Sequence, residues 1–199
     1  GYWAAKLGRE ALRVEWELDG VERADSEQLT AQYLALVRQP GTPAPQAHFK
    51  ADLAPLATAP KKLLAEFRFP YLNHAQMEPL AVTVDLQDER ADLYYAAQMP
   101  GVDAQAAAQL TGLKPEQVQI HVQMAGGGFG RRATPGAETV REATDVALQM
   151  RAAGLVAPVQ VIWSREDDMK SGYYRPLTVH RADIGFDADT CGVITAINE

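Results

Sequence analysis

The strongest chemical feature of this sequence is a run of glycines followed by two arginines. The run consists of Gly126, Gly127, Gly128, Phe129 and Gly130, and Arg131 and Arg132 come directly after it. Glycines let a backbone take positive φ and approach a ligand closely, and successive backbone amides in such a turn can hold an anion or an oxo group. The two guanidinium groups add charge that suits phosphates. The run therefore predicts a ligand-binding loop, and the alternative is a plain strand-to-helix turn with solvated arginines.

The spacing of these glycines argues against two common nucleotide-binding loops. A dinucleotide-binding fingerprint needs G-x-G-x-x-G and an acidic residue at the end of the following strand, and a P-loop needs G-K-[ST]. Neither pattern occurs in the sequence. A nucleotide-binding dehydrogenase is therefore the least favoured interpretation.

Two further polar segments could carry chemistry. His74 and Glu78 lie four residues apart in an expected loop, where they could ligate a metal or relay protons. The alternative is a hydrogen-bonded histidine that fixes a turn. Residues 163–169 hold three adjacent acidic residues after Arg165, and these could bind a divalent cation, although no EF-hand spacing is present. For this segment we favour a solvated loop with local arginine–carboxylate pairs.

Hydrophobic periodicity and turn residues predict the elements that position these side chains. Strands are expected at 13–18, 66–69, 80–86, 91–97, 118–122 and 159–163, with a hairpin of 177–185 and 193–197 around Asp187 and Asp189. Helices are expected at 1–12, at 26–37 capped by Ser26, at 103–110 capped by Asp103 and ended by Gly112, and from Thr134 to Ala153, ended by Gly154. Strands outnumber helices and hairpins are frequent. We therefore predict an α+β fold, with a mixed β-sheet and helices packed on one face.

Composition excludes several classes of protein. Of 199 residues, 47% are hydrophobic and 23% are charged, which is ordinary for a soluble globular protein. No apolar run is long enough for a membrane span. The net charge of −7 makes nucleic-acid binding unfavourable. Cys191 is the single cysteine, so the chain can form no internal disulfide and has no cysteine pair for zinc or an iron–sulfur cluster.

Three segments, taken in order, resemble one family. They are YLNHAQMEPLAVTVDL, QMAGGGFGRR and WSREDDMKSGYYRP. They are similar to the H-A-x-M-E-P, G-G-G-F-G and R-E-(D/E)-D…Y-R-P segments of the molybdenum-binding subunit in the xanthine dehydrogenase and aldehyde oxidase superfamily. The GGGFGRR ending resembles the branch of isoquinoline 1-oxidoreductase and related aldehyde dehydrogenases. The resemblance covers residues 66–199, and residues 1–40 resemble the end of a preceding domain.

The resemblance implies an activity, a cofactor and partners. The family binds molybdenum on a molybdopterin, usually in the cytosine dinucleotide form in bacteria. It hydroxylates an aldehyde or an N-heterocycle with oxygen from water, and it passes electrons to a small [2Fe–2S] subunit. Relatives in this branch are often exported and donate electrons to a cytochrome c. The resemblance thus implies a bacterial enzyme of the periplasm or the cytoplasm, with the periplasm slightly favoured.

The resemblance also assigns residues. Gln98 takes the position of the glutamine whose amide N–H donates to an oxo ligand of molybdenum. Phe129 and Gly130 take the loop positions that face the metal, through backbone amide and ring. The Phe129 ring is also expected to be buried. Gly126, Gly127 and Gly128 shape the loop. Arg131 and Arg132 are suggested to meet the cofactor's phosphate or a partner subunit, and Ala133 stands where purine-oxidising members carry a glutamate.

The expected domain limits follow from the same comparison. Residues 1–45 are expected to form the end of a preceding domain and a linker, and residues 46–199 a first molybdopterin-binding domain that is truncated at its C-terminus. The general-base glutamate of the family is expected to lie beyond residue 199, so no catalytic residue and no metal ligand is assigned here. The chain alone is therefore expected to be inactive and to lack bound cofactor.

One alternative class remains, a structural or docking domain whose glycine loop only shapes a turn. Geometry distinguishes it from the enzyme hypothesis. If Gln98 binds a cofactor, its side chain and the amides of Phe129 and Gly130 should converge on one concave surface. If the loop is purely structural, Gln98 should be buried in an ordinary hydrogen bond far from Phe129.

Overall fold

The computed structural model describes residues 1–42, 54–186 and 193–198, which fall into two compact units. The central unit comprises residues 69–177, and the terminal unit comprises residues 1–68 with 178–199. The domain boundary predicted at residue 45, the turn predicted around Asp187 and the single cysteine, Cys191, lie outside the described residues.

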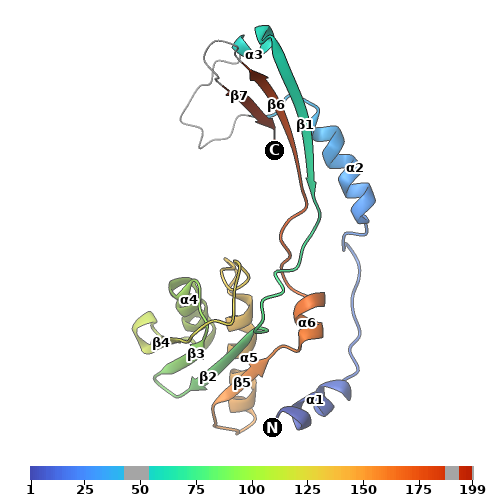
Figure 1. Ribbon diagram of the computed structural model, residues 1–199. Helices are drawn as coiled ribbons and strands as arrows, with labels where there is room; N and C mark the ends of the chain where they lie inside the picture. Colours follow the sequence, from blue (N-terminus) through green and yellow to red (C-terminus); the bar gives the residue numbers. More distant parts are fainter. Residues whose placement is uncertain (43–53, 187–192, 199) are drawn as a thin grey trace. The chain divides into compact units, whose positions relative to one another are not determined.

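A four-stranded mixed sheet forms the central unit (Figure 1). Its strands are β2 (Ala81–Leu86), β3 (Ala91–Tyr95), β4 (Val118–Val122) and β5 (Val159–Ile162), in the order β4-β3-β2-β5. Strand β3 runs parallel to β4, while β2 is antiparallel to both β3 and β5. The predicted mixed sheet is therefore confirmed.

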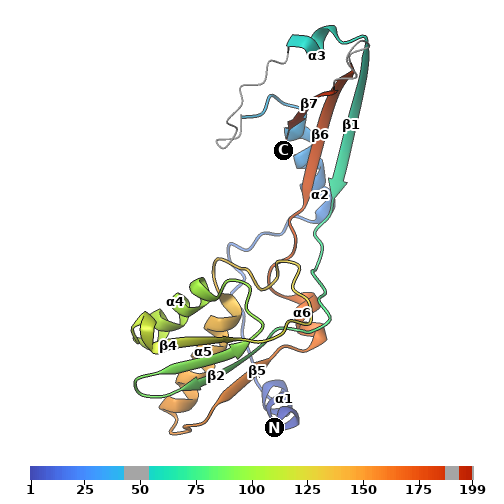
Figure 2. The ribbon, with the colours of Figure 1, turned by 60° about the vertical axis from the view of Figure 1, so that its left-hand side comes forward.

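Two helices cover one face of this sheet, as Figures 1 and 2 show. Helix α4 (Pro100–Thr111) contacts β4, and α5 (Glu138–Ala152) contacts β2, β5 and α4. Along β2, burial alternates, with Val82, Val84 and Leu86 buried and the intervening residues half-buried. This alternation places every second side chain against the helices, because successive side chains of a strand point to opposite faces. The predicted packing of helices on one face of the sheet is confirmed.

The core between sheet and helices combines branched residues of the strands with alanines of the helices. Leu93 on β3 and Ala107 and Ala143 on the helices have no exposed surface. Alanines let the helices approach the sheet closely, while burying a leucine side chain stabilises the fold by about 1.5–3 kcal/mol. The strands that carry the candidate site residues are thus held by a continuous core.

The terminal unit contains a three-stranded sheet with the order β1-β6-β7. Its elements are β1 (Lys61–Phe69), β6 (Thr178–Phe186), β7 (Val193–Asn198), α1 (Tyr2–Glu10), α2 (Ser26–Val37) and α3 (Ala54–Thr58). Strands β6 and β7 pair antiparallel, as the predicted hairpin requires, and α2 and α3 contact β6. No helix in the described part of the chain is long and apolar enough to cross a membrane.

The structure differs from the predicted elements in several places. Residues 13–18 form no strand and are exposed, because alternation produces a strand only where another strand completes the hydrogen-bond ladder. Asp103 does not cap α4; Met99 is the N-cap, and Asp103 lies buried in the first turn. Helix α5 begins at Glu138 rather than after Thr134, because a turn with Ala137 in the left-handed region precedes it.

Other helix limits agree closely with the prediction. Helix α4 ends at Gly112 with φ +73°, and Gly154 follows α5 with φ +83°. Glycine takes this conformation without the steric cost that a Cβ imposes. Helix α2 covers the predicted residues, but Asp25 rather than Ser26 caps it.

Candidate functional site

The three polar segments singled out in the sequence come together within the central unit. We call them the histidine segment (residues 73–79), the glycine loop (residues 126–130) and the acidic segment (residues 163–176). The glycine loop follows β4 and contacts the histidine segment, which in turn contacts the acidic segment.

The glycine loop has an unusual backbone. Gly127, Phe129 and Gly130 all have positive φ, at 91°, 53° and 95°. For a residue as bulky as Phe129 this conformation is unfavourable and persists only where the surroundings enforce it, which is typical of functional sites. The turn is closed by the Arg131 amide, which donates to Gly128 O at 2.9 Å.

Three successive amides of the loop remain available for a ligand. Among the described residues, none accepts a hydrogen bond from the N–H groups of Gly128, Phe129 or Gly130. The ring of Phe129 is 70% exposed, so the expectation that it is buried is wrong. Backbone N–H groups gathered in such a turn form a concavity that suits an anion or an oxo group.

Gln98 lies against this loop. Its Oε1 accepts a hydrogen bond from the Arg132 amide at 3.0 Å, and a Cβ at position 128 would lie 2.8 Å from that oxygen. Because the backbone N–H faces Oε1, the amide nitrogen Nε2 is turned away, and it has no partner in the described part of the chain. Gln98 is exposed and close to the loop, so the buried, remote Gln98 of the docking alternative is not observed.

Arg131 lies inside the protein. Its side chain is 1% exposed, forms an ion pair with Glu138 and lies over the ring of Trp163, with Cζ 5.4 Å from the ring centroid. Its Nε and Nη2 are buried and have no partner among the described residues. Gly172 lies so close that a Cβ there would overlap Arg131 Nη2. The interpretation of solvated arginines is therefore wrong for this residue.

Arg132 is also internal, with a side chain that is 3% exposed. Its guanidinium donates to Gly127 O, Glu78 O and Glu78 Oε2 at 2.9–3.0 Å. The sequence analysis suggested that both arginines meet the cofactor's phosphate or a partner subunit, with solvated arginines as the alternative, and it did not predict their burial. Arg132 pairs with Glu78, which is distant in sequence, whereas Arg131 pairs with Glu138, only seven residues further along the chain.

The histidine segment supports the loop rather than forming a metal centre. Glu78 Oε2 accepts a hydrogen bond from the Gly126 amide at 2.9 Å, besides the one from Arg132. Burial, together with the positive charges of Arg131 and Arg175, lowers the pKa of His74. Within the described ranges, no cluster of histidine, cysteine or acidic residues could hold a metal ion.

The acidic segment forms a short helix, α6 (Arg165–Lys170), instead of a solvated loop. Ser164 caps it through a reciprocal capping box with Asp167. Asp168 has no exposed surface and accepts hydrogen bonds from Gln76 Nε2 and Arg165 Nη1, both at 2.9 Å. Sequence reasoning missed the buried pair of Gln76 and Asp168; the serine and aspartate three apart could have predicted the helix start.

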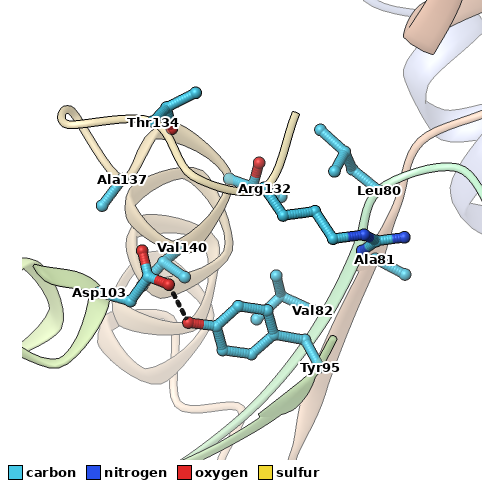
Figure 3. A pocket seen from close by; sticks show the side chains of 10 residues that line it. Leu80, Ala81, Val82, Tyr95, Asp103, Arg132, Thr134, Ala137 and Val140 are labelled. Atoms are coloured by element: carbon cyan, nitrogen blue, oxygen red, sulfur yellow. Dashed lines mark hydrogen bonds between the residues drawn. The ribbon is translucent and has the colours of Figure 1, made fainter. Parts of the chain in front are cut away.

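A small cavity lies on the inner side of the site, between β2, β3 and the helices. Its volume is about 20 Å³, and Figure 3 shows the residues that line it, including Arg132, Tyr95 and Asp103. Tyr95 Oη donates a hydrogen bond to Asp103 Oδ2 at 2.5 Å, and burial raises the pKa of both groups. The cavity has room for one water molecule and not for an organic ligand. An organic ligand of the glycine loop would therefore not occupy this cavity.

Comparisons with known proteins agree with these observations. The family model "Molybdopterin cofactor-binding domain" matches residues 42–198. Isoquinoline 1-oxidoreductase subunit beta of Brevundimonas diminuta is 35% identical over 119 residues, and the match covers 59% of this chain but only 14% of that protein.

Two solved structures share the fold. Quinoline 2-oxidoreductase from Pseudomonas putida 86 matches with a TM-score of 0.57 and 23% identity, over 69% of this chain and 17% of that one. Aldehyde oxidoreductase from Desulfovibrio gigas matches with a TM-score of 0.53 and 19% identity, over 70% of this chain and 15% of that one.

Proposed function

The chain belongs to the molybdopterin cofactor-binding domain family, and on that premise we propose that its glycine loop and Gln98 hold the molybdenum cofactor of a hydroxylase. The proposal rests mainly on one observation: hydrogen-bond donors of the glycine loop and of Gln98 lie close together without acceptors among the described residues. The amides of Gly128, Phe129 and Gly130 have no acceptor in the described part of the chain, and Gln98 Nε2 lies beside them without one.

The donor set fits an oxo-bearing group with little net charge. All four donors are neutral N–H groups, and the nearest guanidinium groups are buried and paired with carboxylates. A neutral amide donates to an oxo ligand without adding charge to it. Arg131 and Arg132 contribute to this site from inside the protein, by fixing the loop, rather than by direct contact with a phosphate.

The residues bind and orient, while the cofactor contributes the reactivity. When bound, the molybdenum cofactor supplies the redox chemistry by which a substrate C–H group and water become a C–OH group, two protons and two electrons. Gln98 Nε2 would donate a hydrogen bond to the bound cofactor, and the positive φ of Phe129 would fix the direction of the neighbouring loop amides. The cytosine dinucleotide form of the cofactor is part of this proposal.

We extend the proposal to the substrate class, the partners and the compartment. The names of the relatives, an isoquinoline 1-oxidoreductase, a quinoline 2-oxidoreductase and an aldehyde oxidoreductase, support an N-heterocycle or an aldehyde as substrate. A small [2Fe–2S] subunit receives the electrons, and a cytochrome c is a further acceptor in a bacterial periplasmic enzyme.

The proposal places this chain within a longer subunit. Residues 46–199 form its first molybdopterin-binding domain, and residues 1–45 end the domain before it. The general-base glutamate belongs to another part of that subunit, so residues 1–199 alone turn over no substrate. A purified 199-residue chain that oxidised an aldehyde or an N-heterocycle unaided would refute this division.

The first test is the content of metal and nucleotide in the full-length subunit, purified from its own host together with its partner subunit. We expect near-stoichiometric molybdenum and the release of CMP on acid hydrolysis. If a folded and correctly matured preparation holds neither, the proposal fails and the docking function replaces it.

A second test separates the donor of Gln98 from its structural contact. Gln98→Glu keeps an oxygen that can accept from the Arg132 amide but removes the Nε2 donor. We expect turnover to fall by about a hundredfold, as for the loss of one donor to a reacting oxygen, with little change in thermal unfolding. Gln160→Glu is the matched control, because Gln160 is an exposed glutamine on β5. Equal turnover in Gln98→Glu and Gln160→Glu would exclude the assigned role.

A further inference from the structure

The side chains of Glu78 and Arg132 join two segments that are far apart in the sequence. Arg132 Nη2 donates to Glu78 Oε2 at 2.9 Å and to Glu78 O at 3.0 Å, and Arg132 Nε donates to Gly127 O at 3.0 Å. Glu78 Oε2 also accepts from the Gly126 amide at 2.9 Å. We call Glu78 and Arg132 the latch.

Burial makes the latch sensitive to small changes. The Arg132 side chain is 3% exposed, so its charge is removed from water and depends on these acceptors. The Glu78 side chain is 41% exposed, so the cost of breaking the pair falls mainly on the buried Arg132 charge that is left without its carboxylate. The planar guanidinium also contacts Gly127 and Glu78 at once, which an ammonium on a flexible stem does not reproduce.

The latch reaches both groups of donors in the proposed cofactor site. Through its guanidinium, Arg132 holds Gly127 O, and through its backbone N–H it holds Gln98 Oε1. A single residue therefore fixes the start of the glycine loop and the direction of the Gln98 amide. A shift of the Arg132 backbone would therefore reach both contacts.

The loop has a glycine where the latch needs space. A Cβ at position 126 would lie 2.5 Å from Glu78 Cβ, which is closer than two carbons can approach. Gly126 is therefore required because the Glu78 side chain occupies that space. Gly126→Ala displaces Glu78 without changing either residue of the latch.

We propose that the latch is a positioning element, which sets how firmly the cofactor is held and how its oxo ligand is oriented, without touching the cofactor. This inference rests on the proposed function and deepens it. Gln98 Nε2 and the loop amides make the contacts, and Glu78 with Arg132 determines their geometry.

The test uses three variants of the full-length subunit with its partner subunit: Arg132→Lys, Glu78→Gln and Gly126→Ala. Arg151→Lys is the control for the substitution itself, because Arg151 also donates to a backbone carbonyl, Leu86 O at 3.0 Å, and pairs with a carboxylate, Asp88, in the turn between β2 and β3, although this pair is more exposed than the latch. The readouts are molybdenum per subunit, the rate of molybdenum loss in dilute urea, the electron paramagnetic resonance signal of the reduced metal, and thermal unfolding.

We expect each latch variant to lose molybdenum about tenfold faster than wild type, as for the loss of one charge-assisted hydrogen bond, and to show a shifted resonance signal. Arg151→Lys should lower the unfolding temperature alone. The inference is overturned if the latch variants match Arg151→Lys in both metal readouts. Wild-type enzyme without molybdenum would instead overturn the proposed function, so the two failures are distinct.

Discussion

Gly172→Ala tests whether the acidic segment holds Arg131 in place. Gly172 has φ +80°, and a Cβ there would overlap Arg131 Nη2 and lie 3.0 Å from Arg131 Cζ. The alanine must therefore adopt a left-handed backbone and also displace a guanidinium that is 1% exposed. The displaced group would lose its position over Trp163 and its ion pair with Glu138.

The magnitude follows from adding two costs. A left-handed alanine costs about 1 kcal/mol relative to glycine. Disrupting a buried ion pair costs about 3–5 kcal/mol, which we reduce to about 2–3 kcal/mol because the Glu138 side chain is 24% exposed. We therefore expect Gly172→Ala to lower the free energy of unfolding by about 3–4 kcal/mol.

Two other glycines isolate the backbone cost. Gly112 and Gly154 have φ of +73° and +83°, and a Cβ at either position would meet nothing within 4 Å. Gly112→Ala and Gly154→Ala should each lower the free energy of unfolding by only about 1 kcal/mol.

The assay is urea unfolding followed by tryptophan fluorescence. Trp163 reports on the central unit once Trp3 and Trp16, which are 72% and 77% exposed, are replaced by phenylalanine. If Gly172→Ala destabilises the protein no more than Gly112→Ala does, the contact between the acidic segment and Arg131 carries no stability and the reasoning is refuted.

Three further predictions concern pH and strain. Burial raises the pKa of Asp103 above its ordinary value of 3.8. The contribution of Asp103 to stability is therefore complete below pH 3.8 and is lost as the pH rises through the raised pKa. Asp103→Asn should raise the melting temperature at pH 7 but not at pH 3.5, and an equal gain at both pH values would contradict this prediction. Burial and the charge of Arg131 lower the pKa of His74 from its ordinary value of 6.5. The contribution of His74 to stability is therefore complete above pH 6.5 and is lost as the pH falls through the lowered pKa. Between pH 7 and pH 5 the His74→Gln variant should lose less free energy of unfolding than wild type, and an equal loss in both proteins would argue against the prediction. Phe129→Gly should change the free energy of unfolding by no more than about 1 kcal/mol, because the ring is 70% exposed and φ is positive, and a larger loss in a urea titration would show that the ring packs.

Local periodicity was sufficient to predict much of the fold. The alternation of Val82, Val84 and Leu86 placed a half-buried strand correctly, and the glycine at 112 ended its helix where expected. These features depend on neighbouring residues, because a strand alternates its faces and a left-handed helix end needs glycine. Residues 13–18 alternate as well and form no strand, since that outcome depends on a partner that the local pattern does not contain.

The ordered motifs carried the family assignment, and the match over residues 42–198 confirms it. Proximity of Gln98 to the glycine loop was expected only from the resemblance, because nothing in the spacing of the two predicts a contact. The parallel pairing of β3 with β4 brings them together, since both strands end at the same edge of the sheet.

The sequence by itself determined most strands of the central sheet, the C-terminal ends of helices α4 and α5, the glycine loop and the family to which the chain belongs. Tertiary structure alone decided which charged and polar side chains are buried. Arg131, Arg132 and Asp168 read as surface residues by type, yet each is buried against partners from other segments. The physical reason is that burying a charge depends on whether a partner meets it in space. Some of those partners are near in sequence, as Glu138 is to Arg131, and others are far away, as Glu78 is from Arg132 and Gln76 from Asp168.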